Sequence, residues 1–226
     1  MSNIFYPSII SSIFEVCITQ PLDVAKIHYQ TNTKIIFTCK ELYKGFIPRA
    51  LGNIPSRTLF LFSQDFYKNI FQKYDYNNIN NIKYKILIPS LAGFTQTLVD
   101  TPIEVIKMNK IMNINNKFLY CGFMSHVLRN MLFLIPVYNF KEYAKINNQN
   151  IFMIGLYGAI GGLVGSYISH PLDTIKTLRQ TNKKDLIKQL SVKDYFKGAH
   201  LRAIMGMCNM CVSVTVFELL KIMDLF

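Results

Sequence analysis

The sequence is poor in charge, and this excludes most soluble classes of protein. Only 17% of its 226 residues are charged, half are apolar, and the mean hydropathy is positive. Soluble globular domains carry about 25% charged residues. The balance therefore favours a membrane protein.

Signatures of catalysis are also lacking. The sequence has no HxxEH-like zinc motif, no GxSxG and no GxxxxGKS, and its four histidines are dispersed. Five scattered cysteines are too few for a disulfide framework, and the one CxxC, Cys208 to Cys211, lies in an apolar run without a second pair. Such cysteines are typical of buried small side chains rather than zinc ligands. We expect no enzyme, no metal and no cofactor.

Acidic residues are scarce as well, 13 against 25 basic ones, which gives a net charge of +12. The basic residues lie at the ends of apolar segments or between them, and no basic stripe interleaved with aromatic residues occurs. We therefore expect lipid headgroups and anionic solutes as partners, and no nucleic acid. The N-terminal stretch has neither a basic region nor a cleavage site, which predicts insertion through internal segments rather than a secretory signal peptide.

Six apolar segments predict membrane-spanning helices: approximately residues 4–30, 48–71, 85–112, 123–145, 151–179 and 199–225. Several are interrupted by polar residues. These are costly in lipid unless they face a protein interior or a water-filled cavity. The expected fold class is an all-α membrane protein whose helices enclose a cavity.

An internal repeat divides the chain into three units. The stretches QPLDVAKIHYQ (20–30), TPIEVIKMNKI (101–111) and HPLDTIKTLRQ (170–180) align without gaps, and each reads proline, any residue, acid, two residues, lysine. A glycine follows in LYKGF, LYCGF and YFKGA, and an acid and a lysine three residues apart close each unit. The units are residues 1–75, 76–148 and 149–226, with two helices in each.

The prolines and charges of the motif have separate expected roles. Proline removes a helical hydrogen bond, so Pro21, Pro102 and Pro171 are expected to kink three helices toward a common axis. A local pair three residues apart explains one acid and lysine, but not three copies at matching sites. Around a threefold pseudo-axis the acid of one unit can instead meet the lysine of the next: Asp23 with Lys107, Glu104 with Lys176, and Asp173 with Lys26.

The tripled motif resembles that of the mitochondrial carrier family of solute transporters, over the whole chain. The resemblance implies six tilted transmembrane helices in three pseudo-threefold repeats, and alternating-access exchange across the mitochondrial inner membrane. The acidic-glycine signature of the family is eroded here and the repeats are short. This compactness resembles the carriers of intracellular parasites and of giant DNA viruses; for a viral protein the membrane would be that of the host mitochondrion.

The resemblance further implies two charged gates. The matrix gate would comprise Asp23, Lys26, Glu104, Lys107, Asp173 and Lys176, braced by Gln30 and Gln180, with Ile111 in the third bracing position. The gate on the cytosolic side would pair Asp65 with Lys145, Glu142 with Lys221, and Glu218 with Lys68.

The resemblance also implies substrate contacts on the second helix of each unit, at a fixed distance after the repeated glycine. Counting seven and eight residues from the repeated glycines gives Gly52 and Asn53, Arg129 and Asn130, and Met205 and Gly206. Arg129 lies deep in its segment, where it either lines the cavity and holds an anion or extends toward the interface. Arg57 and Glu15 are further buried charges, which either contact the solute or pair with each other.

Two substrate classes stay open. Arg129 followed by Asn130, and the FEVCIT stretch of the first segment, resemble carriers of keto acids, dicarboxylates and tricarboxylates such as 2-oxoglutarate and citrate. The compact architecture implies nucleotide or deoxynucleotide exchange (ATP, ADP, dATP), with Phe133 and Tyr138 beside the base, and we narrowly favour this class. Membrane lipids, cardiolipin among them, are the other expected partners, and the expected state is a monomer.

Overall fold

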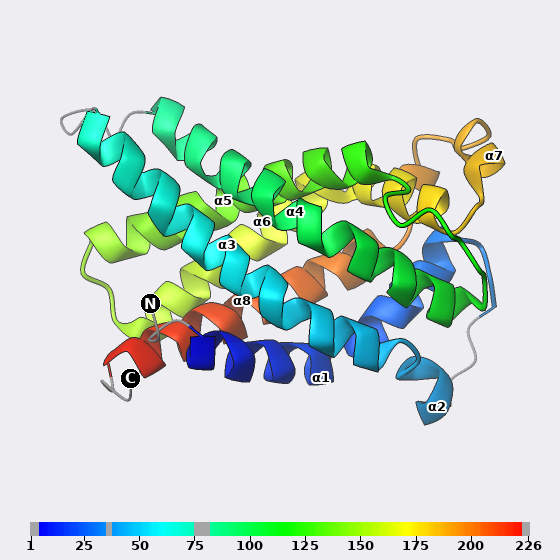
Figure 1. The fold of residues 1–226 in the computed structure, drawn as a ribbon, viewed down its shortest axis with the longest axis horizontal. Helices are drawn as coiled ribbons and strands as arrows, with labels where there is room; N and C mark the ends of the chain where they lie inside the picture. The colour runs from blue at the N-terminus through cyan, green and yellow to red at the C-terminus, as the bar shows by residue number, and fades with distance from the viewer. Residues whose placement is uncertain (1–4, 35–37, 75–81, 223–226) are drawn as a thin grey trace.

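The structure, a computed structural model, describes residues 5–34, 38–74 and 82–222. Within these ranges the side chains of residues 5–12, 57, 61, 74, 184, 217, 218 and 220–222 lie outside the description. The described residues form helices and no strand (Figure 1). The long helices are α1 (Phe5–Gln30), α3 (Phe46–Tyr74), α4 (Ile82–Met112), α5 (Phe123–Ile146), α6 (Ile151–Gln180) and α8 (Ala199–Ile222). The short ones are α2 (Cys39–Leu42), α7 (Lys184–Ile187) and η3 (Asp194–Phe196).

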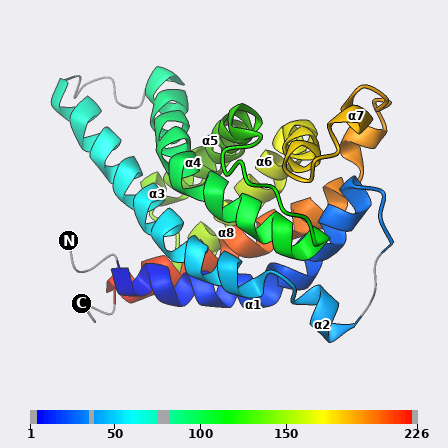
Figure 2. The same cartoon turned by 45° about the vertical axis from the view of Figure 1, so that its right-hand side comes forward.

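The long helices form a closed ring. Each contacts the next one along the chain, and α8 returns to contact α1. Figures 1 and 2 show α2 and α7 at one end of this ring, called here the α2/α7 end, and the start of α1 with the finish of α8 at the other, called here the opposite end. A closed ring leaves every helix with two neighbours and one face toward a common interior.

The helix bounds agree closely with the sequence prediction. Each predicted apolar segment begins and ends within about three residues of the two ends of one long helix. Among the described residues, Ile151–Gln180 and Asp194–Val216 are long and apolar enough by themselves to cross a membrane. The other long helices carry more polar residues in their apolar runs. The membrane architecture as a whole is therefore taken up below as a proposal.

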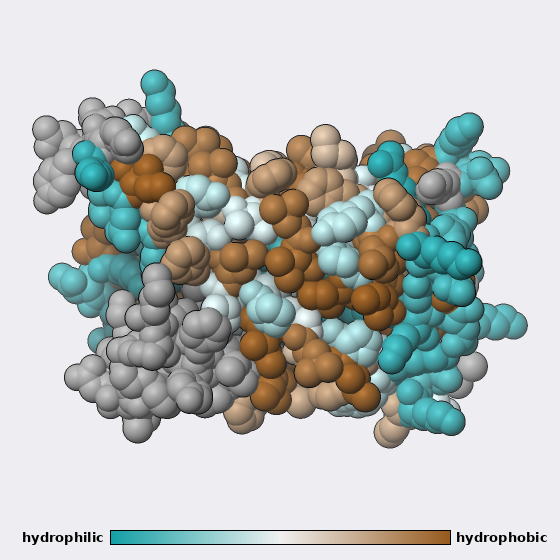
Figure 3. All heavy atoms as spheres, in the orientation of Figure 1, coloured by the Kyte–Doolittle hydropathy of each residue, from teal (hydrophilic) through white to brown (hydrophobic). Residues whose placement is uncertain are grey.

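Many polar and charged side chains are buried beside the apolar ones, and many large apolar side chains are exposed, which is unusual for a soluble protein. Five charged side chains of the repeated motifs are almost fully buried: Asp23, Lys26, Lys107, Asp173 and Lys176. Large hydrophobic side chains face outward along the helices, for example Phe14, Phe94, Leu128, Ile160 and Ile204. Figure 3 shows hydrophobic residues over the middle of one face and hydrophilic residues toward its two ends.

The repeated glycines join the units to one another. Gly45, Gly122 and Gly198 have φ of +77°, +76° and +78°, a left-handed conformation that favours glycine. Each lies against the last turn of the first helix of the next unit: Gly45 beside Ile111, Gly122 beside the carbonyl of Lys176, and Gly198 beside Lys26. The third contact closes the circle, because it returns from the last unit to the first.

Close packing of α6 depends on its glycines. A Cβ at Gly161 or Gly165 would overlap the backbone of α5, at Val137 and Phe133 respectively. A Cβ at Gly162 would overlap the carbonyl of Gly206 in α8. Helix α6 thus approaches both neighbours at backbone distance, as small residues allow in membranes.

The structure continues α1, α4 and α6 through Pro21, Pro102 and Pro171, and the expected kinks stay a prediction. Proline leaves the carbonyl four residues earlier without its helical donor. The Tyr43 hydroxyl donates to the Cys17 carbonyl at 3.3 Å and the Tyr120 hydroxyl to the Leu98 carbonyl at 3.2 Å, and these are the two carbonyls freed by Pro21 and Pro102. Both tyrosines stand two residues before a repeated glycine, where the third unit has Phe196.

We expect Tyr120→Phe to destabilise the protein, because it leaves the Leu98 carbonyl without this donor. The loss should be about 1 kcal/mol, seen as a fall of a few degrees in the thermal unfolding midpoint in detergent. Tyr29→Phe is the control, since Tyr29 is an exposed tyrosine of the same end of the ring. Equal midpoints for the two variants would contradict this role of Tyr120.

Candidate binding cavity

Six charged side chains of the repeated motifs meet inside the helix ring and are called here the charged ring: Asp23, Lys26, Glu104, Lys107, Asp173 and Lys176. Lys107 Nζ lies 2.8 Å from Asp23 Oδ2, and Lys26 Nζ lies 3.0 Å from Asp173 Oδ2. Lys176 Nζ contacts Glu104 Oε2. These are the three pairs between units that the repeat predicts.

The local pairs are longer than the pairs between units. Lys26 Nζ lies 3.6 Å from Asp23, Lys107 Nζ 3.9 Å from Glu104, and Lys176 Nζ 3.8 Å from Asp173. Each carboxylate therefore takes its shortest contact from another unit and a weaker one from its own. The ring thus connects α1, α4 and α6.

Three arginines add positive charge to the charged ring. Arg49 lies 3.4 Å from Asp23 and Arg202 lies 3.7 Å from Asp173. Arg129 reaches two carboxylates, Glu104 at 3.5 Å and Asp173 at 3.6 Å. The ring alone is neutral, with three lysines and three acids, so the arginines give the cluster three positive charges in excess.

The two glutamines expected to brace the ring differ. Gln30 Nε2 donates to Asp173 Oδ2 at 3.1 Å and to Thr174 Oγ1 at 3.3 Å. Gln180 is fully buried, yet neither atom of its side-chain amide has a hydrogen-bond partner among the described residues. The structure thus gives a bracing contact at Gln30 and none at Gln180, which corrects the expectation for Gln180. The equivalent Ile111 packs instead with Val24, Ile27 and Met108.

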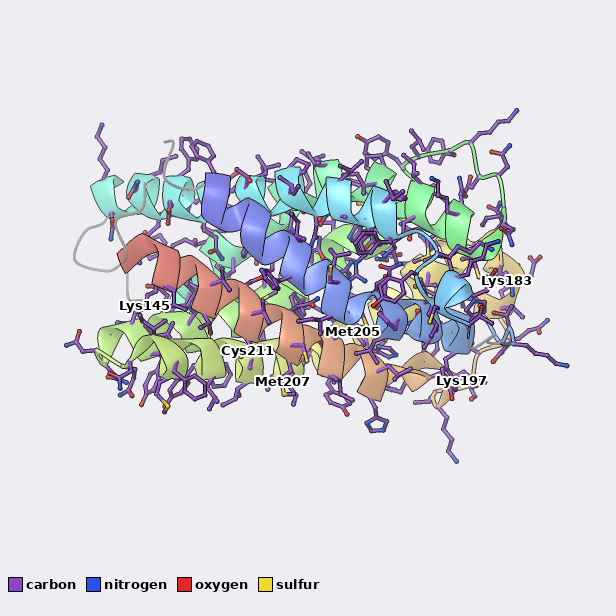
Figure 4. All side chains as sticks on the ribbon, turned by 90° about the horizontal axis from the view of Figure 1, so that it is seen from below. Lys145, Lys183, Lys197, Met205, Met207 and Cys211 are labelled. Carbon is purple, nitrogen blue, oxygen red and sulfur yellow. The ribbon has the colours of Figure 1, made fainter. Side chains whose placement is uncertain are left out.

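A cavity lies beside the charged ring, within the ring of helices. All six of the residues counted from the repeated glycines line it, together with Glu15: Gly52, Asn53, Arg129, Asn130, Met205 and Gly206. Arg129 thus faces the cavity rather than extending toward the interface. Figure 4 labels Met205 between Lys145 at one end and Lys183 and Lys197 at the other, so this lining residue lies between the two ends of the ring.

The two other buried-charge candidates have different outcomes. Glu15 lines the cavity and its Oε2 accepts a hydrogen bond from Ser213 Oγ at 2.9 Å. The side chain of Arg57 lies outside the described residues, so its contacts stay a prediction. Asp100 is a further lining carboxylate that sequence reasoning did not select.

Several buried polar atoms around the cavity have no hydrogen-bond partner among the described residues. They are Asn53 Nδ2, Arg129 Nε, Ser166 Oγ, Arg202 Nη1 and Asn209 Oδ1. Buried polar groups are almost always paired, so atoms that lack partners around one cavity indicate a ligand. Three of them are nitrogen donors, which suit a ligand rich in acceptor oxygens.

The second predicted gate lies partly outside the described residues, and the described part shows a pair that the repeat does not predict. Lys68 Nζ donates to Glu142 Oε2 at 2.7 Å, whereas the repeat predicts Glu218 as its partner. The side chains of Glu218 and Lys221 lie outside the described residues. Asp65 is exposed, and Lys145 lies at the opposite end of the molecule from the charged ring (Figure 4). A long lysine side chain can reach more than one acid. Among the described residues, Lys68 contacts Glu142 on α5.

Sequence reasoning missed one threefold feature and found a second only in part. Asn32, Asn113 and Asn182 have φ of +51°, +51° and +58° and follow the motif lysines by six residues each. Asparagine tolerates this conformation, and it ends the first helix of each unit. The second feature is a polar residue four places after each glycine. The sequence indicates it for Arg49 and Arg202, and His126, which holds the same place in the middle unit, was not selected.

A closed helix ring, exposed apolar side chains and an internal cavity lined by three arginines are features that a solute carrier would have. No family model matches the sequence. The probable mitochondrial 2-oxodicarboxylate carrier of Schizosaccharomyces pombe is 27% identical over 219 residues, covering 78% of this chain and 73% of the relative. The human mitochondrial 2-oxodicarboxylate carrier is 24% identical over 225 residues, with 74% and 71% covered.

Another relative is named for a different substrate. The mitochondrial S-adenosylmethionine carrier protein of Danio rerio is 25% identical over 181 residues, covering 70% of this chain and 67% of the relative. All three relatives are named as mitochondrial carriers, and this chain matches most of the length of each. None of the three is named as a nucleotide carrier. Their similarity over most of this chain supports membership of the mitochondrial carrier family.

The two glutamines provide a matched test of the charged ring. Gln30→Leu should lower the free energy of unfolding by about 1–2 kcal/mol, because it removes a donor from the buried Asp173 carboxylate. Gln180→Leu keeps similar volume and removes an amide without partners, so we expect no loss or a small gain. Denaturation of both variants in detergent measures the difference. A larger loss for Gln180→Leu than for Gln30→Leu would contradict the arrangement.

Proposed function

We propose that the protein exchanges 2-oxodicarboxylates or closely related small carboxylates across the mitochondrial inner membrane by alternating access. The observation that carries the proposal is the set of buried donors without a hydrogen-bond partner among the described residues, around a cavity that three arginines line. A dicarboxylate offers four acceptor oxygens in two groups. It can accept hydrogen bonds from Arg129 and Arg202 together, and each arginine also pairs with its negative charge.

The choice between substrate classes rests on the cavity and the relatives. A nucleotide base is usually held against aromatic faces. Among the described lining residues only Phe133 is aromatic; Tyr138 is buried elsewhere. Two cited relatives carry 2-oxodicarboxylates by name. Both observations favour the carboxylate class over the nucleotides that the sequence first suggested.

The charged ring supports a gate at the α2/α7 end. Its acids and lysines connect the three units. The resemblance to mitochondrial carriers implies that this end would face the matrix. Opening this end requires separating buried ion pairs, each of which has been removed from water at a large cost. A dicarboxylate that pairs with the arginines weakens their hold on Asp173 and Glu104, so solute binding offsets part of that cost.

The remaining architecture is proposed on the same basis. Six spanning helices would place the apolar surface of Figure 3 in lipid and the buried charges around the solute path. The units 1–75, 76–148 and 149–226 would be the three carrier repeats. Lys68 and Glu142, with Asp65, Lys145, Glu218 and Lys221, would form the gate at the opposite end. Contacts with cardiolipin and a monomeric state complete the proposal.

Exchange in liposomes tests the function. We expect purified protein to take up labelled 2-oxoglutarate into vesicles preloaded with 2-oxoglutarate, and less into vesicles preloaded with ATP, dATP or S-adenosylmethionine. Arg129→Gln should raise the KM for 2-oxoglutarate at least about tenfold, since a charge-assisted contact is lost. Arg179→Gln, an exposed arginine outside the cavity lining, is the control.

Two results would contradict the proposal. Exchange of nucleotides without exchange of carboxylates would return the substrate to the other class. Equal effects of the Arg129 and Arg179 substitutions would show that the cavity arginine does not contact the solute.

A further inference from the structure

His126 breaks the threefold pattern at the cavity. It takes the place that Arg49 and Arg202 hold in the other units, four residues after the repeated glycine. Arg49 donates to Thr19 and Gln20, and Arg202 donates to Ser169, each just before the motif proline of its own unit. His126 makes the corresponding contact with Thr101, with Nδ1 3.0 Å from Thr101 Oγ1.

The hydrogen bonds around His126 fix its protonation state. Its Nε2 lies 2.9 Å from a guanidinium nitrogen of Arg129, and arginine can only donate, so Nε2 must accept. Thr101 donates its own hydroxyl proton to the Thr97 carbonyl at 2.7 Å, so its oxygen is left to accept from Nδ1. Both neighbours therefore require a neutral imidazole with its proton on Nδ1.

Arg129 depends on this contact for its direction. Among the described residues, its one hydrogen bond is to His126. Glu104 lies 3.5 Å away, and the Arg129 Nε has no hydrogen-bond partner among these residues but stands 3.6 Å from Asp173 Oδ1. When one edge of the guanidinium donates to His126, the remaining N–H donors of Arg129 stay directed toward the cavity. His126 is thus the residue that sets where Arg129 points.

We propose that neutral His126 is the positioning residue that holds Arg129 ready for a carboxylate of the solute, so that protonation of His126 weakens solute binding. This rests on the proposed function above. A protonated imidazole has no acceptor for Arg129 and places a second cation beside it. Arg129 then moves toward the ring carboxylates and away from the cavity.

The charges that face His126 come from three helices. Glu104 lies on α4, Asp173 and Lys176 lie on α6, and Arg129 lies on α5. Two anions and two cations oppose each other around the ring, so the hydrogen bonds with Arg129 and Thr101 distinguish the neutral from the protonated imidazole. At the equivalent places in the other units a fixed guanidinium replaces this switchable group.

The first test follows the KM for 2-oxoglutarate as the pH of the exchange buffer falls. We expect the KM of the wild type to stay constant near neutral pH and to rise, by up to about tenfold, only once the pH falls well below about 6.5, where an ordinary histidine titrates, with a smaller change in kcat. His126→Leu should raise the KM at pH 7.5, and His126→Gln, whose carbonyl accepts at every pH, should recover much of that loss and remove the rise. His200→Gln, an exposed histidine outside the cavity, should keep the rise.

The second test needs no solute. In protein labelled with ¹⁵N-histidine, the His126 signals, assigned by their loss in His126→Gln, should show an unprotonated Nε2 and a protonated Nδ1 at neutral pH. A proton on Nε2, or an imidazolium at neutral pH, would overturn the proposal even if carboxylate exchange is active. An equal rise of KM at low pH in His126→Gln and the wild type would also overturn the proposal. The pH dependence would then come from protonation of the solute rather than of His126. If the wild type exchanges no carboxylate, the proposed function fails, while the spectrum still decides the state of His126.

Discussion

Three carboxylates lie inside the ring of helices, where each must find its counter-charge on a different unit. The shortest contacts of Asp23, Glu104 and Asp173 run to lysines of neighbouring units, while the lysine three residues away on the same helix lies farther off. A buried carboxylate without a partner is strongly unfavourable. The units therefore cannot separate at this end unless something else neutralises the acids, and this constraint links the fold to transport.

The scaffold repeats three times, but its chemistry does not. Tyrosines cover the carbonyls freed by Pro21 and Pro102, while the third unit has Phe196 in that place. Glutamine braces one corner of the charged ring and isoleucine fills another. A histidine interrupts the layer of arginines. A solute without threefold symmetry needs such differences, because identical corners cannot distinguish its two ends.

Much of this followed from the sequence, because a repeat turns local patterns into long-range contacts. One acid and lysine three residues apart predict only a helical pair, whereas three copies predict partners 72 to 147 residues away. The helix bounds followed from apolar segments with polar interruptions. Six residues of the cavity lining were predicted by counting from the repeated glycine, at the distance that the resemblance to carriers implies. The count holds in all three units because that glycine fixes where each second helix begins.

Side chains with several possible partners could not be predicted in the same way. Lys68 can reach acids on both sides and contacts Glu142, and Gln180 lacks the contact that the equivalent Gln30 makes. Arg129 was selected by its depth in an apolar segment, but its dependence on His126 required the positions of Thr101 and Thr97. Such networks depend on rotamers, which a pattern of residue types does not determine.

Spin labels at the α2/α7 end test the central claim, that this end is closed by ion pairs that must break during exchange. Tyr29, Lys110 and Arg179 are exposed and each follows its motif lysine by three residues, so labels there report the three corners of the charged ring. In vesicles without solute we predict one short distance between each pair of labels. Saturating 2-oxoglutarate must then populate a second, longer distance. A single distance that does not change while exchange proceeds would contradict the account.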